Sequence, residues 1–93
     1  MTGSVARRVV VSGRVQGVGF RWATMAEGRR RGVTGWVRNL AGGDVEAFVQ
    51  GDEHAVAGML GWLREGPSSA RVWRCIVDDA EPDPSSAGFE IRR

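Results

Sequence analysis

The chain has 93 residues, of which 42% are hydrophobic, enough for one small hydrophobic core and too few for two. Thirteen arginines oppose 11 acidic residues and there is no lysine, so we expect no strongly basic nucleic-acid surface and no Walker-type nucleotide site, which needs lysine. One cysteine and one histidine exclude an intrachain disulfide and the usual zinc ligand sets. We therefore expect neither a bound metal nor a cofactor.

Residues 1–93 are expected to form a single cytoplasmic domain. No apolar stretch approaches the roughly 20 residues that span a bilayer, and residues 1–7 lack the apolar middle region of a secretion signal. We find no internal repeats. The protein is expected to act as a monomer, away from membranes.

The first predicted strand covers residues 8–12. Val9 and Val11 point to one face of this strand and Val10 to the other. Both faces are therefore at least partly covered, which indicates an interior position in the sheet.

A helix is predicted over residues 20–31 and ends at Gly32, which suits the left-handed conformation of a helix C-cap. The amphipathic pattern of this helix is weak, and Gly28 costs about 1 kcal/mol relative to alanine. Tertiary packing must therefore supply most of the stability of the helix.

Two strands at residues 34–39 and 45–50 are predicted to form a hairpin through a turn that contains a pair of glycines. Asp52 then offers an N-cap for a second helix at residues 53–65. This helix has the clearest helical periodicity of the chain, with apolar side chains at positions i, i+3, i+4 and i+7, namely Val56, Met59, Leu60 and Leu63.

A fourth strand is predicted at residues 71–78, where apolar side chains occupy both faces and leave its orientation open. A loop at residues 80–88 leads to a short last strand, residues 89–92, with Phe89 and Ile91 facing inward. The order β-α-β-β-α-β followed by the short extra strand predicts a two-layer α/β sandwich, with both helices on one face of a single sheet.

In such a sandwich the first two strands run parallel, so their carboxyl ends emerge at the same edge of the sheet. The glycine-rich segment of residues 13–19 and Asn39 should meet there. Asn39 carries an amide that can both accept a hydrogen bond from water and donate one to it.

The glycine-rich segment has the composition of an anion-binding loop. Gly13, Gly17 and Gly19 permit backbone angles closed to other residues and allow a ligand to approach the main chain. The start of the following helix adds unpaired N–H donors, and Arg21 adds a planar cation suited to two phosphate oxygens. The spacing matches neither the dinucleotide nor the Walker pattern, so a phosphate site and a ligand-free turn both remain open from the loop alone.

The side chains expected near this loop restrict the reaction that it can catalyse. Cleavage of an ordinary phosphate ester generally needs a metal, a nucleophile or a general acid, and none is expected there. A carboxylic-phosphoric anhydride instead releases a carboxylate whose conjugate acid has a pKa of about 4, so no proton has to be supplied. Phosphoryl transfer from such a substrate needs mainly positioning and donors on the phosphoryl oxygens.

Three stretches of the sequence resemble the acylphosphatase family. They are Val11-x-Gly13-x-Val15-Gln16-Gly17-Val18-x-Phe20-Arg21, then Gly35-Trp36-Val37-Arg38-Asn39-x-x-x-Gly43-x-Val45-x-x-x-x-x-Gly51, and the closing Gly88-Phe89-Glu90-Ile91-Arg92. The similarity in length and element order covers nearly the whole chain. It implies a ferredoxin-like fold and hydrolysis of acyl phosphates to carboxylate and inorganic phosphate, with no metal and no covalent intermediate.

The matching positions also imply roles for individual residues. Asn39 would orient the attacking water, and Arg21 would bind the phosphate together with the main-chain amides of Gln16, Gly17, Val18, Gly19 and Phe20. Gly28 and Arg31 stand where helices of the family more often carry alanine and leucine. This departure puts the packing of the first helix in doubt and leaves the site intact.

The alternative is a binding module on the same fold, which senses a phosphorylated metabolite or holds RNA without catalysis. The run at residues 29–31 is the only one with three consecutive arginines, and three charges at the polar end of a helix usually form a solvated face. RNA readers on this fold place aromatic residues on the open sheet face, and Trp36 and Trp73 are the candidates.

Overall fold

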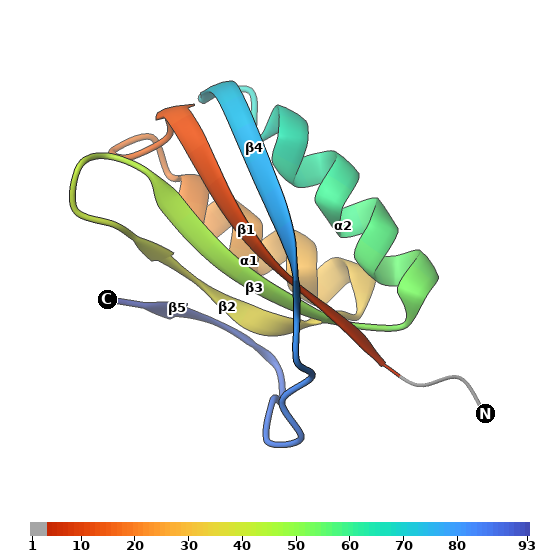
Figure 1. The fold of residues 1–93 in the computed structure, drawn as a ribbon. Coiled ribbons are helices and arrows are strands. Elements are labelled where there is room, and N and C mark those ends of the chain that lie inside the picture. Colours follow the sequence, from red (N-terminus) through yellow and green to blue (C-terminus); the bar gives the residue numbers. More distant parts are fainter. Residues whose placement is uncertain (1–3) are drawn as a thin grey trace.

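The computed structural model describes residues 4–93, so the first three residues of the expected 1–93 domain lie outside it. The elements follow in the order β1 (Val5–Arg14), α1 (Phe20–Arg31), β2 (Thr34–Asn39), β3 (Val45–Gly51), α2 (Glu53–Glu65), β4 (Arg71–Ala80) and β5 (Phe89–Arg92). The strands form one sheet in the order β4-β1-β3-β2-β5, and both helices lie against the same face (Figure 1). The predicted ferredoxin-like sandwich is confirmed.

Strand directions bring the two predicted site segments to one end of the sheet. β3 lies between β1 and β2 and is antiparallel to both, so β1 and β2 run parallel. The loop after β1 and the turn after β2 therefore emerge at the same end, as Figure 1 shows. β5 is parallel to β2 and completes the sheet on that side.

The core lies between the sheet and the helices. Val9 and Val11 of β1 are fully buried opposite Ala47 and Val45 of β3, which explains the alternation seen in the sequence. The predicted apolar stripe of α2 is confirmed, because Val56, Met59, Leu60 and Leu63 are all buried. Asp52 caps this helix by accepting hydrogen bonds of 3.1 Å from the main-chain N–H groups of His54 and Ala55.

β1 extends beyond the predicted residues 8–12 at both ends, because its main-chain pairing with β3 and β4 continues past them. Gly13 therefore belongs to the strand and not to the loop. Its register with β4 shifts after Ser12, and a Cβ atom at Gly13 would lie 2.1 Å from the carbonyl oxygen of Arg71. The glycine at this position permits a close approach of two strands.

The pairing of β4 settles the orientation that the sequence left open. Cys75 and Val77 lie opposite Val11 and Val9 and pack against the core. Trp73, which falls at the register shift, has 77% of its surface exposed. Burial raises the pKa of the Cys75 thiol, which agrees with a packing role rather than a reactive one.

A buried acidic side chain lies on the face of the sheet that has no helices. Val45, Ala47 and Val49 of β3 belong to the core, yet the intervening side chains are buried too. Glu46 is only 1% exposed and forms ion pairs with Arg8 and with Arg38, whose Nε lies 2.6 Å from Glu46 Oε1. Long arginine side chains thus cover the middle of the sheet from the side that has no helices.

Gly28 and Arg31, the two residues of α1 that depart from the family pattern, each take part in a close contact in the structure. A Cβ atom at Gly28 would lie 2.6 Å from the ring of Phe89, so the missing side chain lets β5 approach the helix. Arg31 pairs with Glu27 at 2.7 Å and extends over Gly58 of α2. A glycine thus permits each contact, that of α1 with β5 at Gly28 and that of the Arg31 side chain with α2 at Gly58.

Candidate active site

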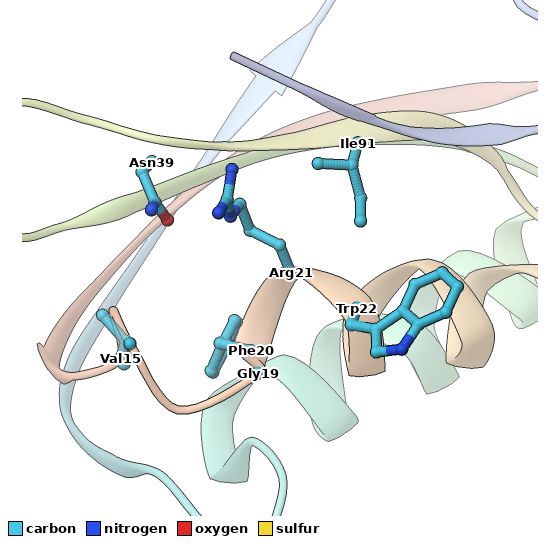
Figure 2. Close-up of a pocket in the computed structure, with 8 residues that line it drawn as sticks. Val15, Gly19, Phe20, Arg21, Trp22, Asn39 and Ile91 are labelled. Carbon is cyan, nitrogen blue, oxygen red and sulfur yellow. The ribbon is translucent and has the colours of Figure 1, made fainter.

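A cavity of about 200 Å³ lies where the loop after β1, the start of α1, the end of β2 and β5 meet (Figure 2). None of the residues that line this cavity is acidic, and one is a cation. They are Val15, Gly17, Gly19, Phe20, Arg21, Trp22, Asn39 and Ile91. The predicted meeting of the glycine loop with Asn39 is therefore seen in the structure.

The loop leads into the N-terminus of α1, where main-chain N–H groups are available as donors. Gly17 and Gly19 adopt left-handed conformations with φ of 75° and 79°, which a residue with a side chain rarely adopts. Gly19 is the N-cap of α1, where no side chain accepts a hydrogen bond and no acid lies in the first turn. The first helical bond is made by Ala23 N–H to Gly19 O at 3.0 Å, so the preceding amides have no helical partner.

The side chains of Arg21 and Asn39 meet in this cavity. Figure 2 shows the guanidinium of Arg21 extending from α1 toward the Asn39 amide at the end of β2. Arg21 makes no side-chain hydrogen bond or ion pair with any of residues 4–93 within the usual distance limits. A permanently charged group without a carboxylate partner, beside uncommitted N–H donors, is suited to an anion.

Asn39 presents an oxygen that the fold leaves without a partner. Its Oδ1 is buried, and no donor among the described residues bonds to it. Buried polar atoms of native proteins are nearly always hydrogen-bonded to protein or to water. The oxygen is therefore available to accept a hydrogen bond from a molecule that enters the cavity.

Gln16 and Val18 do not line the cavity, in contrast to the other predicted substrate-binding residues, Gly17, Gly19, Phe20 and Arg21. The Gln16 side chain is committed to the main-chain carbonyl oxygens of Leu40 and Asp44, each 2.8 Å from its Nε2. The Val18 carbonyl accepts a hydrogen bond of 2.8 Å from Ser69 Oγ. Both contacts fasten the loop to neighbouring segments.

Phe20, the first residue of α1, also packs in the core. Its side chain is 1% exposed, and its ring centroid lies 6.0 Å from that of Trp62 on α2. The first residue of α1 is thus anchored in the core. This burial holds the neighbouring Arg21 at a defined place above the loop.

Three residues that line the cavity, Val15, Trp22 and Ile91, are not among the predicted site residues. Trp22 directly follows Arg21, so its position in the first turn of the helix was a signal that could have been used. Ile91 was predicted to face inward, yet 37% of its surface is exposed because it borders the cavity. Only the pairing of β5 with β2 places it there.

Among residues 4–93, no group of three or more His, Cys, Asp or Glu side chains is close enough to hold a metal ion. No helix in the same range is long and apolar enough to cross a membrane. Metal independence itself stays a prediction.

Comparisons with known proteins agree with this fold. A family model described as Acylphosphatase matches residues 7–91. The acylphosphatase of Anaeromyxobacter dehalogenans is 50% identical over 92 residues, which is 99% of each chain. The solved structure of an acylphosphatase from Coxiella burnetii has a TM-score of 0.87 at 36% identity, covering 96% of this chain and 93% of the other. That of acylphosphatase from Bacillus subtilis has a TM-score of 0.90 at 31% identity, covering 96% and 99%. The chain therefore belongs to the acylphosphatase family of enzymes.

Proposed function

We propose that the protein hydrolyses acyl phosphates to a carboxylate and inorganic phosphate within the cavity between α1 and Asn39. The observation that carries this proposal is the pairing of an uncommitted cation with an unpartnered acceptor. Arg21 lines a cavity without carboxylates, and the buried Asn39 Oδ1 lies in the same cavity without a hydrogen-bond partner among the described residues. The first group suits a phosphate and the second suits a water.

The phosphoryl group is held by charge and by main-chain donors. Arg21 binds two of its oxygens, and the amides of residues 16–20 supply further hydrogen bonds at the start of α1. These donors are in place before the substrate arrives, because Gly17 and Gly19 hold the loop open and Gln16 fastens it. Preorganised donors of this kind stabilise the charge on the oxygens as the transition state forms.

Asn39 positions the nucleophile. Its Oδ1 accepts a hydrogen bond from a water molecule, which leaves a lone pair of that water directed at phosphorus. The new oxygen–phosphorus bond forms while the bond between phosphorus and the acyl oxygen breaks. The carboxylate departs with the electron pair, and both protons of the water remain with the phosphate product, which is released as dihydrogen phosphate.

The leaving group explains why the cavity needs no acid. The conjugate acid of a carboxylate has a pKa of about 4, so the departing anion is stable in neutral water. None of the eight residues around the cavity is an Asp, Glu, His, Cys or Lys. An alkoxide leaving group would need a proton donor that these residues do not supply.

The contacts of the aromatic and basic residues weigh against the alternative of an RNA-binding module. The ring of Trp36 stacks with Phe48 at 6.1 Å between centroids, and the guanidinium carbons of Arg38 and Arg92 lie 5.4 and 5.0 Å from its centroid. Trp73 lies on the edge strand β4, separated from β2 by two strands. These residues therefore do not form one continuous platform for bases.

The arginine run at residues 29–31 is also partly committed. Arg29 Nε donates a hydrogen bond of 3.2 Å to the carbonyl oxygen of Phe89, while Arg30 and Arg31 both pair with Glu27. Fewer of these charges are therefore free for a phosphate backbone. We accordingly expect weak, nonspecific nucleic-acid binding at most.

The test is hydrolysis of benzoyl phosphate and acetyl phosphate by the purified protein in buffer without added metal, measured as phosphate release. We expect turnover well above the buffer rate, no effect of a chelator, and competitive inhibition by inorganic phosphate. Absence of turnover, with tight and salt-dependent binding to single-stranded RNA, would establish the alternative. Loss of turnover in a chelator would contradict the metal-free mechanism.

Single-domain organisation, a monomeric state and a cytoplasmic location remain predictions. The matched family region, residues 7–91, supports the first of these. Sedimentation analysis of the purified protein tests the monomer, which is expected because the proposed site uses residues of one chain only.

A further inference from the structure

A second cavity adjoins the site along the outer stripe of α1. Its volume is about 430 Å³, and it is lined by Gly19, Trp22, Ala23, Met25, Ala26 and Arg29. Residues 19, 22, 26 and 29 recur at intervals of three and four and so lie along one line of the helix. We call this cavity the α1 groove. Apart from Arg29 at one end, its lining side chains are apolar.

The α1 groove is continuous with the anion cavity. Gly19 and Trp22 line both of them, so a molecule whose phosphate lies beside Arg21 can extend directly into the groove. Trp22 is 67% exposed, and Ile91, on the other side of the entrance, is 37% exposed. Large apolar side chains that remain exposed beside a polar site commonly mark a surface for an apolar ligand.

The direction of the proposed reaction places the acyl group at this entrance. In phosphoryl transfer the attacking oxygen and the leaving oxygen lie roughly in line through phosphorus. Figure 2 shows Arg21 between Asn39 on one side and Ile91 and Trp22 on the other. With the water held by Asn39, the leaving carboxylate faces Trp22 and the start of the α1 groove.

The lining of the groove indicates which acyl groups it favours. Trp22 offers a flat aromatic surface, and Met25 and Ala26 continue it by one helical turn. No acidic or amide side chain lines the groove, and Nε of its one cation, Arg29, already donates to the Phe89 carbonyl at 3.2 Å. Because affinity rises with each CH₂ group that is buried, a long or aromatic acyl chain gains from this contact while the single methyl of acetyl phosphate gains little.

We propose that Trp22 is a specificity-determining residue and that the α1 groove binds the acyl part of the substrate, selecting acyl phosphates with a large apolar or aromatic acyl group. This inference rests on the proposed function and deepens it. It assigns the substrate class to a surface that shares only Gly19 with the phosphate-binding loop.

The test compares kcat/KM for acetyl, benzoyl and octanoyl phosphate among the wild type, Trp22→Ala and Trp73→Ala. Trp73 is a matched control, because it is a similarly exposed tryptophan on β4, away from both cavities on α1. We expect Trp22→Ala to lower kcat/KM for benzoyl and octanoyl phosphate by about tenfold, the lower end of what a lost apolar contact causes. Acetyl phosphate should change by less than about twofold on the same grounds, and Trp73→Ala should change none of the ratios.

The possible outcomes distinguish a failure of this inference from a failure of the proposed function. If the wild type hydrolyses none of the three substrates, the proposed function fails and the acyl site fails with it. If the wild type hydrolyses them and Trp22→Ala lowers all three equally, the proposed function stands and the inference is wrong. Trp22→Phe keeps an aromatic surface and should retain most of the preference, and circular dichroism shows whether each variant is folded.

Discussion

The side chain of Gln16 donates a hydrogen bond of 2.8 Å to the main-chain carbonyl oxygen of Leu40, the residue that follows Asn39. A second bond of 2.8 Å joins the same amide to the Asp44 carbonyl, and Leu40 N–H donates to that carbonyl as well. The anion loop is thus fastened to the turn that begins at Asn39. Gln16 thereby sets the distance between the phosphate-binding amides and the residue proposed to hold water.

Gln16→Ala should therefore impair both stability and catalysis. The Leu40 and Asp44 carbonyls each lose one donor but keep a main-chain N–H partner, and a typical hydrogen bond contributes about 0.5–1.5 kcal/mol. We therefore expect the free energy of unfolding to fall by about 1–2 kcal/mol and kcat by about tenfold. Urea titration and steady-state kinetics with benzoyl phosphate measure the two effects. A folded variant with unchanged kcat would show that Gln16 stabilises the turn without positioning the site.

Arg21→Ala should abolish most of the activity without unfolding the protein. Loss of one preorganised donor typically lowers turnover by about 10²–10³, and the Arg21 side chain makes no ion pair within residues 4–93 that its removal would break. Arg21→Lys should recover only part of the loss, because lysine is a point charge without the planar fork. Arg64→Ala, which removes an exposed arginine from α2, is the matched control. Wild-type kinetics in Arg21→Ala would overturn the assignment.

Asn39→Ala should lower kcat by a larger factor than it weakens phosphate binding. A residue that orients water acts chiefly in the transition state, whereas inorganic phosphate reports the ground-state contacts of the anion cavity. The measurements are kcat for benzoyl phosphate and the inhibition constant of inorganic phosphate. Equal losses in the two constants would instead assign Asn39 to phosphate binding.

Gly28→Ala should destabilise the protein, although alanine favours helix by about 1 kcal/mol over glycine. The new Cβ would lie 2.6 Å from the Phe89 ring, and overpacking of this kind costs about 1–3 kcal/mol. Gly61→Ala on α2 is the control, because no atom lies within 4 Å of its added Cβ. Thermal unfolding should show a lower Tm for Gly28→Ala and a higher Tm for Gly61→Ala. A higher Tm in both would mean that β5 yields easily to the added methyl group.

Glu46 should make stability depend on pH in the acid range. Burial by itself raises the pKa of Glu46, but hydrogen bonds and charges from Arg38 and Arg8 outweigh it, so the pKa lies below its ordinary value of 4.5. A carboxyl with a depressed folded pKa stabilises the protein above the unfolded pKa and ceases to do so as pH falls through the folded one. We therefore expect Glu46→Gln to cost about 1–2 kcal/mol at pH 7.

The cost of Glu46→Gln should shrink as the pH is lowered below 4.5, because the unfolded wild-type chain then takes up a proton at Glu46, whereas the folded protein does so only at its lower pKa. Urea titrations of both proteins at pH 7 and pH 3 measure this difference. Glu90→Gln, in the exposed pair of Glu90 with Arg92 at 3.8 Å, should show little effect at either pH. A cost for Glu46→Gln that does not change with pH would contradict the role assigned to the ion pairs.

Local patterns in the sequence predicted most of the fold. The stripe from Val56 to Leu63 and the cap at Asp52 defined α2 within its own residues, because helix periodicity and capping depend on near neighbours. The orientation of β4 could not be predicted in this way. β4 is an edge strand with a register shift at Trp73, so its two faces differ less in burial than those of an interior strand.

By itself, the sequence determined the element order, and through it the expectation that Arg21 and Asn39 meet, since the parallel direction of β1 and β2 follows from one helical crossover. Only the tertiary structure decided that Gln16 fastens the loop to the turn, that Gly28 makes room for Phe89, and that Trp22 and Ile91 flank the entrance of the site. These contacts join segments far apart in the chain, and their existence depends on how strands and helices pack. Periodicity, which records only the burial of each residue, carries no information about which distant residue provides the contact.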